Sequence, residues 1–339
     1  MKLFELSYKT INELKGPLVL VEKVVSCKIG EIVKIIYPNG FIGTGEVLKV
    51  ERDKILIQIF SDPKGLSSKA EIVFTDDIVK VPVSKQILNR TFDGALNPLD
   101  GKKHFIADKK VPITGYPINP VSRASPSDFI ETGISAIDGL NTLVKGQKLP
   151  IFSSAGLPSK ELVRFILKNS KITSENEFAI VFVAIGLSYY DYYHYFETIT
   201  SLMVNYVAFI NLLDSPTMER LLVPRYGLTV AEYLAFDLGF DVLVIMSDMT
   251  NYCDALREIS SAREELPGRR GYPGFMYSDL ASLYERAGRL KNREGSITIL
   301  PVLTMPEDDI THPIPDLTGY ITEGQIVLSR ELHQKDIFP

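Results

Sequence analysis

The sequence predicts an α/β protein in which a small N-terminal β-barrel is followed by a larger domain with a parallel sheet. Up to about residue 75, short apolar or alternating segments are separated by Gly, Pro, Asn and Asp, as in small barrels. From residue 151 onward, apolar runs alternate with helical segments, which is typical of a parallel sheet with helices on its faces. We therefore expect one domain at 1–75 and a second at 76–339.

Length and composition agree with this division. The chain has 339 residues, whereas single hydrophobic cores stop growing near about 250–300 residues. The net charge of −5 gives no electrostatic argument for wrapping nucleic acid. The sequence has no run of about 20 apolar residues and no apolar core like that of a signal peptide, so we expect no insertion into a membrane.

Cysteine and histidine give no sign of a metal site. Cys27 and Cys253 are far apart in the sequence, and we expect them to be reduced thiols of a cytosolic protein. The histidines are isolated from one another, so none is expected to be a ligand; they are His104, His194, His312 and His333.

Four strands are expected in the first domain. Each is an apolar run or alternates polar and apolar residues with a period of two; they are 18–24, 31–37, 41–50 and 54–60, with Pro38-Asn39-Gly40 as a turn. A barrel of this kind could bind an oligonucleotide, but its charges are mixed and no row of stacking aromatic residues stands out. A structural or assembly role is the favoured interpretation.

The second domain opens with a connecting region at 76–130, which prolines such as Pro117 keep extended and rich in turns. A helical pattern starts near Glu131. Strands are then expected at 178–185, 204–210, 241–246 and 297–303, and helices at 159–170, 189–203, 216–238, 251–265 and 276–290. The chain ends at Pro339 without a helix, shortly after a strand-like segment at 325–328, and we expect a cut there rather than a domain boundary.

The stretch 149–162 has the outline of a phosphate-binding loop, with an apolar run, a small-residue turn and an amphipathic segment. A working loop reads G-x-x-x-x-G-K-[ST]. Here the two glycine positions hold Ser153 and Pro158, the lysine position holds Ser159, and the serine or threonine position holds Lys160. All four fixed positions therefore differ, and the turn between them consists of Ser154, Ala155, Gly156 and Leu157.

Three of these differences remove a contact to phosphate or magnesium. Pro158 has no N–H to donate, Ser159 carries no charge, and Lys160 has no hydroxyl for Mg²⁺. A hydrogen bond to a charged group is worth roughly 1.5–3 kcal/mol, so losing two or three lowers affinity by about a thousandfold or more. Catalysis should fall further, because the same groups stabilise the transition state. Lys160 could swing back toward a phosphate, although it stands one position late.

Two further elements would complete a nucleotide-hydrolysing site. Asp248 ends an apolar strand and could hold the Mg²⁺ shell, but the favoured interpretation is that it caps the helix that follows. The strand at 178–185 should end in an acid that polarises water, yet no carboxylate follows it before Asp191. The aromatic residues in that place favour a packed or interface face; they are Tyr189, Tyr190, Tyr192, Tyr193 and Tyr195.

The segment 255–280 joins two helices through a turn bounded by Gly and Pro. A rigid, bent loop that displays Arg269 and Arg270 is of the kind that contacts a partner, and the alternative is a plain surface hairpin between helices. The loop consists of Pro267, Gly268, Arg269, Arg270, Gly271, Tyr272, Pro273 and Gly274.

Taken together, several segments resemble the non-catalytic B subunit of V-type and A-type rotary ATPases and ATP synthases. The matching segments are 119–124, 129–139, 146–153, 155–158, 247–252, 255–280, 284–289 and 311–326. None is specific alone, but together they are highly specific, and the resemblance extends from about residue 10 to the end of the chain. In that family the defective loop is normal for this subunit, although a His-Asn pair usually stands where this chain has Ser159 and Lys160.

The resemblance implies a RecA-like second domain with a degenerate P-loop, in a subunit that is not an enzyme by itself. It implies a hetero-hexameric ring in which three such subunits alternate with three catalytic A subunits, at the cytoplasmic face of a membrane. The barrels would meet peripheral stalks, and loop 267–274 would face the central rotor stalk. The resemblance implies no required cofactor or metal, weak ATP or ADP binding at subunit interfaces, no nucleic-acid partner and no direct membrane insertion.

The resemblance also implies a C-terminally incomplete copy. The family's arginine finger lies in a Leu-Ser-Arg segment beyond the position of Pro339, so we expect this residue and the closing helical domain to be absent. Two other functions fit the residues less well. A stand-alone ATPase needs a loop lysine and a catalytic glutamate, and a hexameric RNA translocase needs an intact loop and a basic, aromatic barrel face.

Overall fold

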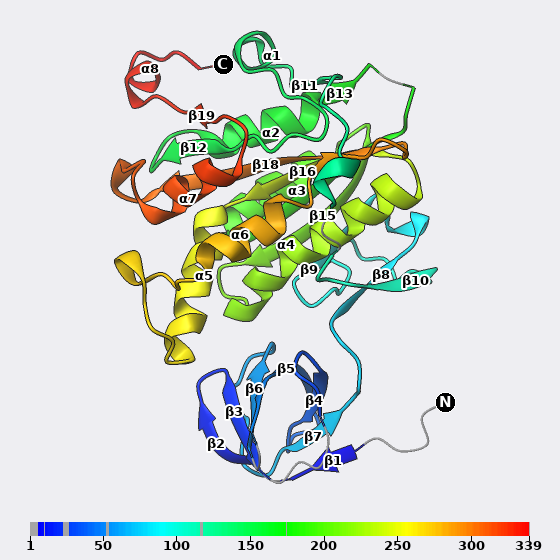
Figure 1. Ribbon diagram of the computed structural model, residues 1–339, viewed down its shortest axis with the longest axis vertical. Coiled ribbons are helices and arrows are strands. Elements are labelled where there is room, and N and C mark those ends of the chain that lie inside the picture. Colours follow the sequence, from blue (N-terminus) through cyan, green and yellow to red (C-terminus); the bar gives the residue numbers. More distant parts are fainter. Residues whose placement is uncertain are drawn as a thin grey trace.

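The computed structural model describes residues 6–9, 11–22, 27–51, 54–115, 118–173 and 175–338. Pro117, Pro339 and the end of the first expected strand (23–24) lie outside the described residues. Figure 1 shows a small barrel at one end of the molecule and a layered α/β domain at the other. Within the described part, no helix is long and apolar enough to cross a membrane.

The barrel is a nearly closed antiparallel sheet of seven strands, in the order β1-β7-β4-β5-β6-β3-β2. The strands are β1 (Leu6–Tyr8), β2 (Ile11–Lys15), β3 (Leu18–Glu22), β4 (Ile32–Ile36), β5 (Ile42–Val50), β6 (Lys54–Ile59) and β7 (Glu71–Phe74). Alternate side chains such as Val19, Val21, Val33 and Ile35 fill the interior. The four expected strands are confirmed as β3 to β6. β2 was missed because most of its residues are polar.

The second domain is built on a mainly parallel sheet in the order β19-β12-β18-β16-β14-β15-β9, with the short β17 (Gly288–Arg289) antiparallel to β18. The strands are β9 (Arg90–Asp93), β12 (Ile151–Ser154), β14 (Phe178–Leu187), β15 (Asn205–Leu212), β16 (Asp241–Ser247), β18 (Ser296–Met305) and β19 (Ile326–Val327). The central strands are buried on both faces, which explains why the sequence shows them as continuous apolar runs.

Helices cover both faces of this sheet (Figure 1). They are α1 (Ser135–Leu140), α2 (Ser159–Asn169), α3 (Tyr189–Thr200), α4 (Thr217–Glu232), α5 (Met249–Ala262), α6 (Met276–Tyr284), α7 (Pro313–Ile321) and α8 (Arg330–Gln334). A π-helical turn, η3 (Tyr233–Asp237), extends α4. Short 3₁₀ turns occur at η1 (Lys85–Ile87), η2 (Pro120–Ser122), η4 (Arg269–Gly271) and η5 (Pro306–Asp308).

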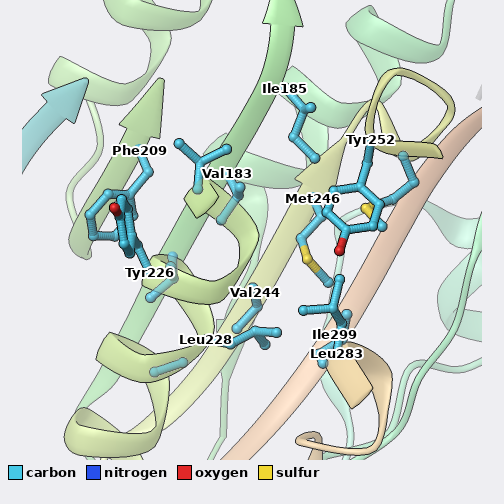
Figure 2. Close-up of a cluster of buried hydrophobic side chains, with 14 of the residues drawn as sticks. Val183, Ile185, Phe209, Tyr226, Leu228, Val244, Met246, Tyr252, Leu283 and Ile299 are labelled. Carbon is cyan, nitrogen blue, oxygen red and sulfur yellow. The ribbon is translucent and has the colours of Figure 1, made fainter. Parts of the chain in front are cut away.

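Strand periodicity divides the buried side chains between two cores. In β14, Val181, Val183 and Ile185 join the core beneath α4, α5 and α6, whereas Ile180 and Phe182 join the core beneath α2 and α3. Figure 2 shows the first of these cores, where strand residues such as Val183 and Met246 lie near Tyr226 and Leu228 of α4 and Tyr252 of α5. These two layers hold the carboxyl ends of the strands at one edge of the sheet.

Four expectations about chain segments were wrong. The helix expected at 276–290 ends at Tyr284, and Gly288–Arg289 form β17 instead. The region 76–130 is more than a connector, since β8 (Lys80–Val83) pairs with β10 (Lys109–Pro112) and β9 forms the edge of the main sheet. Glu131 belongs to β11 (Ile130–Glu131), which pairs with β13 (Lys171–Ile172), so the helix begins only at Ser135. A helix, α8, also follows the 325–328 segment, because Ser329 accepts a hydrogen bond from the Leu332 N–H and caps it.

The two domains touch through Gln58 of β6. Its buried side chain donates to the sulfur of Met218 in α4 and accepts a hydrogen bond from Arg263, just after α5. The chain passes from β7 to β8 at the expected boundary near residue 76, and the division into 1–75 and 76–339 stays a prediction.

Candidate functional site

The degenerate loop lies at the carboxyl edge of the parallel sheet, where ligands bind in open α/β folds. β12 ends at Ser154 and α2 begins at Ser159, so the expected strand, turn and helix are all present. Gly156 has φ +79°, a left-handed conformation that glycine adopts most readily. Ser153 and Ser154 are both buried, and the Ser153 hydroxyl donates to the Ser154 carbonyl at 3.0 Å.

Two backbone N–H groups of the loop are already used within it. The Leu157 N–H donates to the Ser154 carbonyl at 3.2 Å, and the Ser159 N–H donates to the Leu157 carbonyl at 2.8 Å. Pro158 is the N-cap of α2, has no N–H and makes no side-chain cap bond. A phosphate cradle needs such N–H groups turned toward the ligand. This loop keeps the outline of a cradle but turns two of its donors inward and lacks a third.

Lys160 is engaged by the neighbouring helix. Its ammonium lies 2.6 Å from the Asp191 carboxylate in the first turn of α3, and the Ser188 hydroxyl donates to the same oxygen at 2.6 Å. Burial raises the pKa of Asp191, but the hydrogen bonds from Lys160 and Ser188 outweigh it, so the pKa is lowered overall. The charge that could have rescued phosphate binding is therefore paired with α3.

Asp248 has the geometry of a helix cap, which is one of the two roles expected from the sequence. It is the N-cap of α5, where its Oδ1 accepts from the Thr250 N–H at 2.8 Å. The same carboxylate accepts from the Thr304 N–H at 3.2 Å and from the Thr304 hydroxyl at 2.5 Å. Burial raises the pKa of Asp248, and these hydrogen bonds oppose the rise. The geometry supports a helix cap that ties α5 to β18.

Asp308 and Arg330, which the sequence did not single out, lie beside the loop and contact it. Asp308 of η5 accepts hydrogen bonds from the Arg330 guanidinium at 2.7 and 3.1 Å, and Arg330 also donates to the Ala155 carbonyl at 2.9 Å. The pKa of Asp308 is lowered, first by Arg330 and then also by the Ser154 hydroxyl and the Ala155 N–H. Parallel pairing of β12 with β18 could have pointed to η5, but nothing in the sequence pointed to Arg330.

An apolar pocket of about 250 Å³ lies between the loop and α8. Its lining includes Leu157, Pro158, Leu162, Leu328 and Leu332. No group of three or more His, Cys, Asp or Glu that could hold a metal ion occurs in the described ranges.

The loop 267–274 is only partly displayed. Pro267, Gly268, Gly271 and Gly274 are exposed, and the Gly268 N–H donates to the Tyr272 carbonyl at 2.7 Å to close the turn. Tyr272 and Pro273 are buried, so the loop is exposed at Arg269 and Arg270 but anchored at its second half. The Tyr272 hydroxyl donates to Asp254 of α5 at 2.9 Å and fixes the turn to that helix.

Both arginines of this loop are exposed and paired within the chain. Arg269 lies 3.1 Å from Asp316 of α7 and donates to the Thr311 carbonyl at 2.9 Å. Arg270 lies 2.8 Å from Asp309. These contacts tie the loop to α7 and to the segment between β18 and α7.

The tyrosine cluster divides between core and surface. Tyr195 is buried beside Phe182, whereas Tyr189, Tyr190 and Tyr193 of α3 are 65%, 74% and 67% exposed. An exposed aromatic face of this kind is suited to contact with another protein surface. Helix α3 therefore has a packed side, which carries Tyr195, and an exposed side suited to an interface.

Comparison with known proteins matches both domains. The model of the ATP synthase alpha/beta family nucleotide-binding domain matches residues 133–339, and that of the family's beta-barrel domain matches residues 11–76. The V-type ATP synthase beta chain of Geotalea uraniireducens (strain Rf4) is 59% identical over 339 residues, which is 100% of this chain and 77% of that protein.

Proposed function

Because the chain belongs to the ATP synthase alpha/beta family and resembles a V-type B subunit along its whole length, we propose that it is the non-catalytic B subunit of a rotary ion-translocating ATPase or ATP synthase. In this role it would alternate with catalytic A subunits in a hexameric ring. The ring would be a peripheral part of a membrane-bound complex on its cytoplasmic side.

The observation that carries the non-catalytic role is the state of the loop. Phosphoryl transfer depends on positioning and on charge stabilisation by loop N–H groups, a lysine and Mg²⁺. Here Pro158 lacks the N–H, Ser159 lacks the charge, and Lys160 is paired with Asp191. Asp248 is occupied by Thr250 and Thr304. No residue of this set is free to stabilise a transferring phosphoryl group.

The remaining surfaces suit an assembly role. We propose that the barrel contacts peripheral stalk subunits, that the rigid loop 267–274 faces the central rotor stalk, and that no cofactor is required. We also propose weak ATP or ADP binding at subunit interfaces. Helix α3, which carries the exposed tyrosines, packs next to α2. We propose that a neighbouring subunit contacts the domain on this side, close to the degenerate loop.

The direct test is ATP turnover by the purified chain, alone and mixed with the catalytic A subunit. Alone, the chain should show no turnover above buffer, and any turnover in the mixture should require the A subunit. Turnover near 1 per second by the chain alone, the lower end for phosphoryl-transfer enzymes, would rule the proposal out. Activity must co-purify with the chain through two chromatographic steps, which separates real turnover from a contaminant.

A further inference from the structure

We propose that Asp308 and Arg330 form an internal latch that occupies the phosphate side of the loop 153–160 and excludes phosphate groups from it. The inference rests on the proposed function, because it concerns the same non-catalytic loop. It adds a physical reason for weak nucleotide binding beyond the missing template residues.

The contacts place a carboxylate where a phosphate oxygen would be held. Asp308 receives the Arg330 guanidinium through Nε at 3.1 Å and Nη2 at 2.7 Å. Arg330 Nη2 also donates to the Ala155 carbonyl at 2.9 Å, so the pair bridges the turn of the loop. The Ser154 hydroxyl and the Ala155 N–H interact with the Asp308 carboxylate as well. Backbone N–H groups and hydroxyls of this type are the groups that hold phosphate oxygens.

The chain reaches this position through an unusual backbone. β18 runs parallel to β12 with Met305 opposite Ser154, so the residues after Met305 emerge beside the loop. Glu307 and Asp308 both have φ +58°, a left-handed conformation that side-chain-bearing residues rarely adopt. Two such residues in succession persist only where surrounding contacts hold them, and they aim η5 at the loop.

Arg330 brings a positive charge to the turn of the loop, whose own Lys160 is paired with Asp191. It is the first residue of α8, and it comes to the turn from 175 residues away in the sequence. A guanidinium binds phosphate through two parallel hydrogen bonds, as it binds a carboxylate. Arg330 is therefore able to hold a phosphate group once Asp308 no longer occupies it.

The ligand chemistry is that of the phosphate chain of a nucleotide. The family model that matches residues 133–339 is that of a nucleotide-binding domain, which points to this ligand class. A phosphate chain would compete with Asp308 for the same donors, namely Arg330, the Ser154 hydroxyl and the Ala155 N–H. The latch thus sets the affinity of the loop through an intramolecular competitor.

The experiment measures binding of inorganic tripolyphosphate to the full chain by titration calorimetry at low ionic strength. Asp308→Ala should bind at least about tenfold more tightly than the wild type, since it frees hydrogen bonds to a charged ligand. The double variant Asp308→Ala/Arg330→Ala should return to the wild-type level. Asp308→Asn removes the charge while keeping the size of the side chain, and it should show the same gain if Asp308→Ala fails to fold.

Glu331→Ala is the matched control, because it removes one negative charge from α8 where Glu331 pairs with Lys335 at 2.6 Å, away from the loop. This variant should bind like the wild type. An equal gain in Glu331→Ala, or no gain in either folded Asp308 variant, would overturn the latch. Failure of the latch in this binding experiment would not affect the proposed non-catalytic role. That role is tested separately by ATP turnover of the unaltered chain, and its failure would not change the binding result.

Discussion

The Lys160 ammonium lies 2.6 Å from the Asp191 carboxylate, which joins the first turn of α2 to the first turn of α3. The lysine of the degenerate loop is thus held by a neighbouring helix. The same contact defines what substitutions at this position should do.

Lys160→Ala should leave ATP affinity within about twofold of the wild type, because the ammonium is paired with Asp191 and stands one position late for phosphate. Unfolding free energy should fall by only about 0–1 kcal/mol, since Lys160 is half exposed. Fluorescence titration with a nucleotide analogue and urea denaturation measure the two quantities. A several-fold loss of affinity would show that Lys160 does reach the phosphate.

The Lys160–Asp191 pair should also leave a signature in the pH dependence of stability. The pKa of Asp191 is lowered in the folded protein, so its contribution is present above the unfolded value of about 3.9 and is lost as pH falls through the folded value. The stability difference between the wild type and Asp191→Asn should therefore be constant near neutral pH and shrink below about pH 4. A difference that grows on acidification would contradict this assignment.

Lys145 and Asp241 form a pair 2.8 Å apart, in which both side chains are only 3% exposed. Lys145→Met would leave the buried Asp241 without its cation, so unfolding free energy should fall by about 3–5 kcal/mol. Lys335→Ala, which breaks the exposed pair with Glu331, serves as control and should cost less than about 0.5 kcal/mol. Urea denaturation measures both losses of unfolding free energy. Equal losses in the two variants would contradict the claim that burial makes the Lys145–Asp241 pair more important.

Gly227 of α4 packs closely on the sheet. A Cβ added there would lie 2.4 Å from a methyl group of Val183, whose branched side chain is stiff. Gly227→Ala should therefore destabilise the protein by about 1–3 kcal/mol despite the better helix propensity of alanine. Gly139→Ala in α1, where a Cβ meets nothing within 4 Å, should instead stabilise by about 0.5–1 kcal/mol. Thermal unfolding that moves in the same direction for both variants would contradict this prediction.

Strong local patterns made much of the fold predictable. The runs that became β14, β15, β16 and β18 are apolar along almost their whole length because both faces of each strand are buried. β9 was missed because its place at the sheet edge depends on parallel pairing with β15, more than a hundred residues later in the chain. Its own four residues carry no distinguishing pattern.

Part of the candidate site could likewise be predicted from the sequence and part could not. The departures at Ser153, Pro158, Ser159 and Lys160 are visible in the sequence because the phosphate-loop template has fixed spacing. The roles of Asp308 and Arg330 are not, since they depend on a tertiary approach of η5 and α8 to the loop. From the sequence, Asp248 could be a Mg²⁺ ligand or a helix cap, with the cap favoured, and its bonds to Thr250 and Thr304 support the cap.

The measurement closest to the central claim is the mass of the assembly that forms when this chain is co-expressed with the catalytic A subunit of the same complex. Native mass spectrometry should find a ring with three copies of each chain, because a non-catalytic B subunit completes its interfaces only with catalytic neighbours. A chain that stays separate from the A subunit, or that builds a ring from copies of itself and hydrolyses ATP, would contradict the proposed role.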